Sequence, residues 1–395
     1  MTSLLLPGAG GPSARYELGE PGAWTRPTGP ITSRIAYAAA HVIPPAWSEN
    51  APGAPAVLDW DATLAYRHEL WSYGLGVADA MDTAQRGMGL DWPATQELIK
   101  RSSAEAASVG GLIACGAGTD QLDVAAVPEG RAGLKVVLDA YREQVETVTG
   151  AGATVIVMAS RALAATARSA EDYLEVYDAL LDEVQRPVIL HWLGPMFDPA
   201  LSGYWGSDRV HTATESFLSL IRSHPGKVEG VKVSLLDAAH EVSLRAELAA
   251  LPGPQVRMYT GDDFNYPELV HGDGWLHSDA LLGIFAAIYP AASTALQAYD
   301  VGDRGRGRAI LDGTRDLGRH IFGAPTPYYK TGIAFLSWLN GRQGGFAMVG
   351  GLQSGRSLPH LAHTFRLADR AGLLLDPPLA AHRMSQLLAV HGIEA

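Results

Sequence analysis

Short apolar runs alternate with longer amphipathic segments along most of the chain after residue 30. Eight runs have the length and composition of buried strands, and the segments between them carry apolar residues at three- and four-residue spacing, as amphipathic helices do. This alternation predicts an α/β fold, a (β/α)₈ barrel with a closed parallel sheet surrounded by helices. The predicted strands are 34–40, 76–81, 111–115, 154–158, 188–192, 230–235, 256–260 and 274–277.

The ends of the chain differ from the alternating middle. Residues 1–30 are rich in glycine and proline and are expected to form an irregular N-terminal arm. The barrel is expected to occupy residues 31–300. Residues 301–395 are patterned only for helices and are too long to be one barrel helix, so they are predicted to form a C-terminal helical region packed on the barrel.

Composition narrows the class of function. The chain has 395 residues, of which 47% are hydrophobic and 18% charged, as in a globular protein with a large core. A net charge of −12 argues against a general basic surface, so we expect a small-molecule substrate and neither nucleic acid nor membrane as a partner. The single cysteine, Cys115, cannot form an internal disulfide. With no signal-like segment and no run near the roughly 20 apolar residues of a membrane span, a cytoplasmic location is expected.

A lysine in the middle of an apolar run is the most informative single residue. Strand alternation places Lys232 on the face of Gly230 and Ser234, opposite the apolar face of the same run. Burial disfavours the ammonium form and lowers the pKa, which is the condition for a neutral amine that attacks a carbonyl. A lysine at a strand end whose head reaches solvent is the structural alternative.

Polar groups follow the predicted strands, at the end of the barrel where such folds place their active sites. An aspartate or threonine at a strand end often caps a helix, and a single histidine is often a core residue. Their concentration at one end nevertheless indicates a functional site. The residues are His41, Asp82, Thr83, Gly116, Gly118, Thr119, His191, Asp262, Asp263, His277, Ser278 and Asp279.

Four short motifs occur in an order that is shared with a known family. They are the loop 116–119 (Gly-Ala-Gly-Thr), the lysine strand 230–233 (Gly-Val-Lys-Val), the segment 261–263 (Gly-Asp-Asp) and the segment 274–278 (Gly-Trp-Leu-His-Ser). With these motifs the chain resembles the dihydrodipicolinate synthase/N-acetylneuraminate lyase superfamily of Schiff-base aldolases, and specifically a longer, divergent branch described only as dihydrodipicolinate-synthase-like. The resemblance covers residues 33–372. It implies the barrel fold, an imine-forming Lys232 and a homodimer or homotetramer.

The departures from the family concern the groups around the substrate. The fifth strand of the family ends Leu-Tyr-Asn-x-Pro, and His191 stands here at the place of the tyrosine that relays protons. The paired tyrosines of the fourth strand have no counterpart in 158–160, nor does the carboxylate-binding arginine in 196–198. The family's Gly-Thr-Thr-Gly-Glu loop, which cradles a keto acid, is replaced by 81–85 with its Asp82. An aspartate repels a carboxylate, so pyruvate is not the expected substrate.

The expected activity is therefore that of a class I lyase or aldolase that needs no cofactor beyond its lysine. Lys232 forms an imine with a ketone or aldehyde, His191 relays protons, and His277 with Asp279 forms a second acid/base pair. Carboxylates and imidazoles outnumber arginines at the strand ends, which favours a polyhydroxylated keto compound. Retro-aldol cleavage and loss of water both stay open. The expected substrate contacts are Asp82, Thr83, Gly118, Thr119, Asp262, Trp192 and Tyr204, the two aromatic residues by stacking on a flat face unless they form a subunit contact instead.

Two other functions fit the same pattern. A metal-dependent lyase, isomerase or hydrolase would use His41, Asp82, His191 and His277 as ligands of Zn²⁺ or Mn²⁺, although no compact motif such as His-Glu-x-x-His is present. A barrel that binds a metabolite without catalysis would keep Lys232 as a structural residue.

Overall fold

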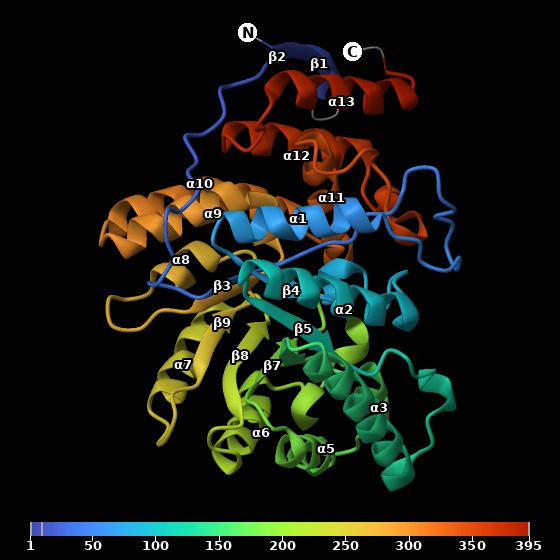
Figure 1. The fold of residues 1–395 in the computed structure, drawn as a ribbon, viewed down its shortest axis with the longest axis vertical. Coiled ribbons are helices and arrows are strands. Elements are labelled where there is room, and N and C mark those ends of the chain that lie inside the picture. The colour runs from blue at the N-terminus through green and yellow to red at the C-terminus, as the bar shows by residue number, and fades with distance from the viewer. Residues whose placement is uncertain (1, 9–10, 394–395) are drawn as a thin grey trace.

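The structure is a computed structural model that describes residues 2–8 and 11–393. Eight parallel strands close into a barrel in which each strand pairs with the next along the chain and the last pairs with the first (Figure 1). This confirms the (β/α)₈ barrel. The strands are β3 (Ala36–Ala39), β4 (Gly76–Asp79), β5 (Ile113–Ala117), β6 (Thr154–Val157), β7 (Val188–Leu193), β8 (Val228–Ser234), β9 (Arg257–Thr260) and β10 (Asp279–Leu282).

Helices surround the barrel and continue beyond it. Several begin at an aspartate or serine whose side chain accepts a hydrogen bond from the first turn, as Asp59 and Asp91 do. The helices are α1 (Trp60–Ser72), α2 (Trp92–Val109), α3 (Gly130–Gly150), α4 (Arg161–Thr166), α5 (Ala170–Glu183), α6 (Val210–Ser223), α7 (Ala238–Ala249), α8 (Tyr266–His271), α9 (Ile284–Asp300), α10 (Arg304–Ile321), α11 (Tyr329–Leu339), α12 (Leu358–Arg370) and α13 (Pro377–Val390).

Strand alternation divides the apolar residues between two sides of the sheet. Outward residues such as Val231 and Val233 pack against the helices. Inward residues form a separate cluster that fills the barrel, so the barrel is a packed core and not a pore. This inner cluster comprises Tyr37, Ala39, Ala78, Met81, Ala114, Ile156, Met158, Ile189, Tyr259 and Leu281.

The first seven predicted strands overlap observed ones, but the position of the eighth is wrong. Residues 272–278 form a turn, in which the Asp273 carboxylate accepts hydrogen bonds from the backbone N–H groups of Trp275 and Leu276 at 2.9 and 2.8 Å. Gly272 and Gly274 adopt positive φ angles of 70° and 104°, which glycine tolerates best. The strand is the next apolar segment, β10. An apolar run of that length fits a buried strand or a buried helix equally well.

The prediction of an irregular N-terminal arm is also wrong for its first half. Strands β1 (Ser3–Gly8) and β2 (Gly11–Glu17) form an antiparallel hairpin that lies beside α13 in Figure 1. The Tyr16 hydroxyl donates to the Asp369 carboxylate of α12 at 2.7 Å, and Leu4 and Leu6 are buried. Isolated hairpins are only marginally stable in water, so this one depends on the helices that it covers.

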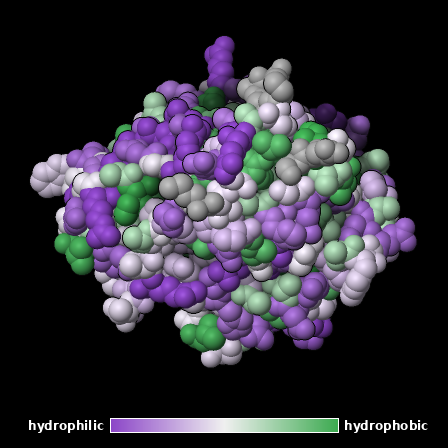
Figure 2. Space-filling model, turned by 90° about the horizontal axis from the view of Figure 1, so that it is seen from above, coloured by the Kyte–Doolittle hydropathy of each residue, from purple (hydrophilic) through white to green (hydrophobic). Residues whose placement is uncertain are grey.

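The helices predicted for residues 301–395 are present as α10 to α13. They follow α9, the last helix of the barrel, in the sequence. In Figure 1, α10 lies beside α9, and α12 and α13 lie above them. The division of the chain into three domains stays a prediction. In the view from above, polar residues dominate the surface, with apolar residues scattered between them (Figure 2). Among the described residues, no helix combines the length and the apolar character that crossing a membrane requires.

Candidate active site

Lys232 points into the barrel near the carboxyl ends of the strands. It lies on β8, in register with His191 on β7 and Tyr259 on β9. The side chain is only 7% exposed, so its head does not extend into bulk solvent. The inward face that alternation predicted for Lys232 agrees with the structure, since the neighbouring Val231 and Val233 pack outward.

A small chamber of about 10 Å³ lies at the end of this lysine. Phe197, Phe322 and Tyr329 cover it with aromatic rings; Phe322 and Tyr329 stack with their centroids 4.2 Å apart. Burial lowers the pKa of Lys232, and the carboxylates of Asp82 and Asp263 oppose part of this shift. No hydrogen bond of the amine is found within the described residues. The remaining lining residues are Met81, Thr83, Leu193, Ser234 and Gly283.

Asp263 is the carboxylate of the Gly-Asp-Asp motif that faces the lysine. Its Oδ1 accepts a hydrogen bond from Ile284 N at 2.8 Å, at the start of α9. Burial raises the pKa of Asp263 above the ordinary value, while the nearby Lys232 opposes that rise. A carboxyl group and an amine whose pKa values are shifted toward each other can exchange a proton more readily than the free groups do.

A tyrosine from the C-terminal region completes the chamber. Tyr329, the first residue of α11, places its hydroxyl 2.9 Å from Oγ1 of Thr83. Burial raises the pKa of Tyr329 well above its ordinary value, so the hydroxyl keeps its proton until a stronger base accepts it. Sequence reasoning missed this residue. The only signal was the polar pair 329–330 at the start of a helix that is otherwise strongly apolar.

A second buried lysine lies on the same helix. The Lys330 ammonium donates to Pro327 O at 3.1 Å and has Met88 Sδ at 3.5 Å. Burial lowers the pKa of Lys330 to about 8. The Lys330 amine already has a carbonyl partner and does not line the chamber. Unlike Lys232, it is therefore not positioned to attack a carbonyl compound bound there.

The chamber adjoins a larger cavity of about 140 Å³ above β4 to β7. Asp82 and Leu193 line both spaces, so they separate the lysine from the larger cavity. Gly118 and Thr119 line the larger cavity, where the Thr119 hydroxyl lies 2.6 Å from that of Ser160. The structure therefore brings Asp82, Thr83, Gly118 and Thr119 to the lysine end of the barrel.

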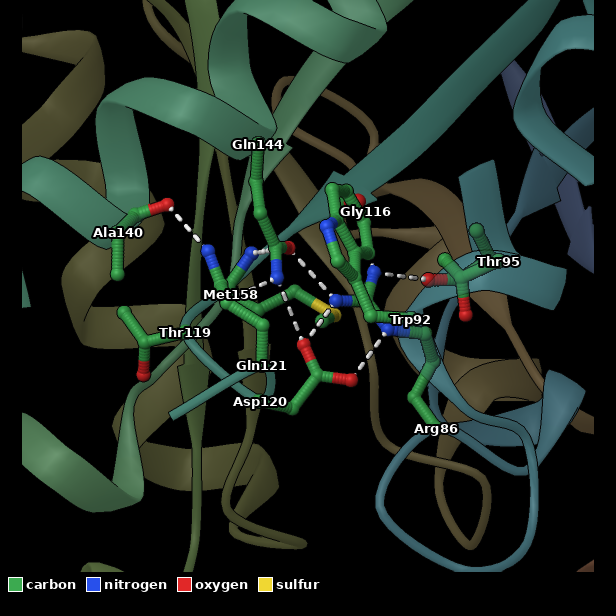
Figure 3. A network of polar contacts seen from close by, with 12 residues as sticks. Arg86, Trp92, Thr95, Gly116, Thr119, Asp120, Gln121, Ala140, Gln144 and Met158 are labelled. Carbon is green, nitrogen blue, oxygen red and sulfur yellow. Dashed lines mark hydrogen bonds and ion pairs between the residues drawn. The ribbon is translucent and has the colours of Figure 1, made fainter. Parts of the chain in front are cut away.

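Arg86 forms the floor of this larger cavity and is fully occupied by protein acceptors (Figure 3). Its guanidinium forms a two-pronged ion pair with Asp120 and also donates to Gly116 O at 3.0 Å and Gln144 Oε1 at 2.6 Å. These contacts tie the loops after β4 and β5 together. The other arginine at this cavity, Arg161, pairs with Asp198.

Two backbone strains lie beside the site. Ala80 and Leu236, which follow β4 and β8, have φ angles of 50° and 54°. Positive φ is unfavourable for residues with a Cβ and persists where the surrounding structure imposes it. Asp82 and Ser234, at the end of the lysine strand, both line the chamber.

His191 lies in register with Lys232 but does not line the chamber. It is 1% exposed, its Nε2 is 3.3 Å from Ser234 Oγ, and its Nδ1 has no partner among the described residues. Burial, and then the charge of Lys232, lower its pKa well below 6.5. His191 is therefore a neutral ring beneath the chamber, which it reaches only through Ser234.

Asp262 closes a turn and lines neither the chamber nor the adjoining cavity. Its carboxylate accepts hydrogen bonds from Phe264 N at 2.9 Å and from the backbone and side chain of Asn265 at 3.0 and 2.8 Å. These bonds close the turn that leads into α8. Of the two aspartates of the Gly-Asp-Asp motif, Asp263 is the one that lines the chamber, whereas the prediction named Asp262 as the substrate contact.

The predicted aromatic contacts, Trp192 and Tyr204, belong to the outer core. Trp192 points outward from β7 and packs edge-on against Phe217 of α6, with ring centroids 5.4 Å apart. The buried Tyr204 hydroxyl accepts from Ser160 N at 3.0 Å, behind the wall of the larger cavity. Odd and even strand residues face opposite sides, so a residue next to an inward His191 faces the helices.

His277 and Asp279 lie at the opposite, amino-terminal end of the barrel. Asp279 is the first residue of β10, and it accepts hydrogen bonds from Ile35 N at 2.8 Å and Arg257 Nη1 at 2.9 Å. The prediction that His277 and Asp279 form an acid/base pair in the Lys232 site is therefore wrong. The eighth strand begins at Asp279, after His277, so both residues lie at its amino end and not at its carboxyl end.

The proposed metal ligands do not meet. His41 is buried with Nε2 3.1 Å from Gln343 Oε1, and His277 lies at the other end of the barrel from Asp82. Within residues 2–8 and 11–393, no group of three or more histidine, cysteine, aspartate or glutamate side chains is arranged to hold a metal ion.

Comparison with known proteins agrees with this architecture. The family described as "Protein of unknown function (DUF993)" matches residues 4–393. The chain belongs to the DUF993 family. No curated protein matches this DUF993 chain.

Solved structures of dihydrodipicolinate synthases share the fold. The synthase from Bacteroides thetaiotaomicron is 13% identical, with 83% of this chain and 98% of that one covered and a TM-score of 0.61. The prophage protein YagE of E. coli K12, of the dihydrodipicolinic acid synthase family and solved with pyruvate, is 16% identical (85% and 99% covered, TM-score 0.61). The synthase from Thermotoga maritima is 14% identical (86% and 99% covered, TM-score 0.58). The DUF993 chain is thus a divergent protein with the dihydrodipicolinate synthase fold.

Proposed function

We propose that this DUF993 protein is a class I lyase in which Lys232 forms a Schiff base with a ketone or aldehyde. The observation that carries the proposal is a buried amine with a lowered pKa and no hydrogen-bond partner within the described residues, at the end of the barrel that holds active sites in this fold. Structures with this fold include one named as a complex with pyruvate, which is consistent with carbonyl chemistry.

The reaction follows from the groups in the chamber. The neutral Lys232 nitrogen attacks the carbonyl carbon, and the carbonyl oxygen leaves as water after it has received protons. The resulting iminium draws electrons from the neighbouring carbon. In retro-aldol cleavage the bond between the α- and β-carbons breaks as the β-hydroxyl loses its proton, which releases a carbonyl compound and leaves an enamine that then takes up a proton. In dehydration the α-carbon first loses a proton to give the enamine, and the protonated β-hydroxyl then leaves as water, which gives a conjugated iminium. Hydrolysis of the iminium frees the lysine in both routes.

The proton carriers in this scheme are Tyr329 and the two carboxylates. The hydroxyl of Tyr329, held by Thr83, can donate to the departing oxygen, and Asp263 or Asp82 can accept the proton of a substrate hydroxyl. His191 acts as a positioning residue through Ser234. This assignment replaces the relay expected from sequence.

The charges around the chamber favour a polyhydroxylated keto compound. Asp82 and Asp263 line the chamber, whereas the arginines of the adjoining cavity already pair with Asp120 and Asp198. Carboxylates accept hydrogen bonds from hydroxyl groups and repel a carboxylate. A substrate acid would have to displace Asp198 from Arg161. The homo-oligomeric state and the cytoplasmic location stay predictions.

Reductive trapping tests the proposal. The protein is incubated with dihydroxyacetone, a ketohexose or pyruvate, reduced with borohydride and digested, and the modified peptide is identified by mass spectrometry. We expect an adduct on Lys232 that is larger with the hydroxylated ketones than with pyruvate. Lys330 is the internal control, because it is equally buried but already hydrogen-bonded.

Three other outcomes count against the proposal. An adduct confined to Lys330 or to surface lysines would rule out Lys232 as the nucleophile. Turnover that is lost to a chelator and restored by a metal would support the metal-dependent alternative. Tight binding of a ketone with neither adduct nor turnover would support a metabolite-binding barrel.

A further inference from the structure

The amino-terminal end of the barrel contains a cavity that the proposed lyase activity does not use. It has a volume of about 500 Å³ and opens between the starts of β3, β9 and β10 and the end of α7. Three arginines and one aspartate supply its charged lining, in a chain whose net charge is −12. Such a concentration of guanidinium groups needs a physical reason, because like charges in one cavity repel each other.

The arginines are Arg34, Arg245 and Arg257, and they are held from three different elements. Arg34 is only 7% exposed, and its Nε donates a hydrogen bond to Val270 O at 2.9 Å. Its Nη2 has no acceptor among the described residues. A buried guanidinium nitrogen without an acceptor is costly. Among the described residues no carboxylate forms an ion pair with Arg34, so its charge beside the cavity is not neutralised by a direct partner.

The other two arginines are only partly neutralised. Arg245 donates to Ser278 Oγ and Leu269 O, both at 3.3 Å, and lies 3.7 Å from the exposed carboxylate of Asp273. Arg257 pairs with Asp279 at 2.9 Å, and that carboxylate is also bound to Ile35 N. The single lining carboxylate is therefore already occupied, and among the lining residues the three arginines outnumber it.

His277 also lines this cavity, beside the arginines. Partial burial of the ring, and then the nearby positive charges, lower the pKa of His277 to about 4. These charges belong to Arg34, Arg245, Arg304 and Arg257. Four guanidinium groups therefore act on one imidazole. The ring is neutral at pH 7 and can donate one hydrogen bond.

Trp275 borders the cavity with a flat apolar surface. Its side chain is 94% exposed, at the tip of the turn closed by Asp273. An exposed indole beside a basic cavity can stack on a planar group of a ligand whose charged end is bound inside.

We infer that this cavity binds a multivalent organic anion, such as a phosphate ester, whose charged group contacts Arg34, Arg245 and Arg257 and whose planar part stacks on Trp275. Guanidinium groups bind phosphate and carboxylate through paired hydrogen bonds, which suits a cavity with several arginines on different sides. The site is separate from the Lys232 chamber, since the two are at opposite ends of the strands.

Calorimetric titration with pyrophosphate and with ATP tests this inference. His277→Glu places a negative charge at an exposed position of the cavity, and His277→Gln is its neutral, matched control. We expect one binding site per chain, pyrophosphate affinity reduced about tenfold or more in His277→Glu, as expected for a nearby like charge, and affinity close to that of the unaltered protein in His277→Gln. Lys232→Met should bind pyrophosphate normally.

The aromatic part of the inference has its own readout. Trp275→Ala should weaken ATP more than pyrophosphate, because only ATP has a planar group to stack. Equal losses for both ligands would overturn the stacking. Absence of pyrophosphate binding at millimolar concentration, or equal binding by His277→Glu and His277→Gln, would overturn the anion site, and melting temperatures of all variants establish that they are folded.

Discussion

The two ends of the barrel differ in the charged side chains that line their cavities: carboxylates surround a lysine at the carboxyl end, and arginines surround an aspartate at the amino end. At the carboxyl end a lysine faces the carboxylates Asp82 and Asp263, while at the amino end an aspartate and a histidine lie among arginines. Both sets follow from strand direction, because residues after a parallel strand collect at one end and residues before it at the other. A difference of a few residues in where a strand begins therefore moves a side chain across the whole barrel, as it does for His277.

The largest expected effect is at the carboxyl end. Lys232→Met should abolish adduct formation in the chamber and lower turnover by several orders of magnitude, because Lys232 is the one amine among the lining residues of the chamber. Rates with the trapped ketone and the adduct mass measure it. His277→Gln at the amino end is the control and should leave both unchanged; a comparable loss there would erase the functional difference between the ends.

Removing the tyrosine hydroxyl should have the next largest effect. Tyr329→Phe should lower turnover about 10²- to 10⁴-fold, the range for loss of a proton-transferring group. The Michaelis constant should change little, and the amine should still form an adduct. Tyr328→Phe, next in the chain and outside the chamber lining, is the matched control. Unchanged turnover in Tyr329→Phe would remove this residue from the mechanism.

At the amino end, the expected effect of losing a carboxylate is on stability and not on activity. Asp279→Asn weakens the ion pair with Arg257 and the hydrogen bond from Ile35 N. We expect the free energy of unfolding in urea to fall by about 1–3 kcal/mol, as for a buried group that loses a charged partner. Adduct formation at Lys232 should persist; its loss in a folded protein would mean that the two ends are coupled.

A further expected effect, confined to acid conditions, is a difference in acid sensitivity between two histidines. Burial lowers the pKa of His41, which follows β3, from 6.5 to about 4. The unfolded chain binds this proton at higher pH, so stability falls as pH drops through that window, by at most about 3 kcal/mol.

His41→Gln should therefore flatten the decrease in unfolding free energy between pH 7 and acid conditions. The pKa of His277 is lowered in the same direction, but its exposure to solvent makes the expected change in His277→Gln smaller. Urea titrations at several pH values measure both. An equal or larger effect for His277 would show that its ring is more enclosed than the structure has it.

Most of the barrel could be predicted from sequence, and the candidate site only in part. Seven strands and the inward face of Lys232 follow from local periodicity, which the chain shows without reference to distant residues. Thr83, Asp82, Gly118 and Thr119 follow from the rule that strand ends meet. The choice between Asp262 and Asp263 depended on which carboxylate closes the turn into α8, and periodicity does not contain that information.

By itself the sequence determined the alternation of strands and helices and a lysine on the inner face of one strand, because both depend on spacing between near neighbours. Tertiary structure alone decided that Tyr329 from α11 meets Thr83 above Lys232, and that His277 joins three arginines at the far end. The reason is physical: packing of distant segments and the exact start of a strand depend on the whole folded chain, and a short apolar run does not specify either.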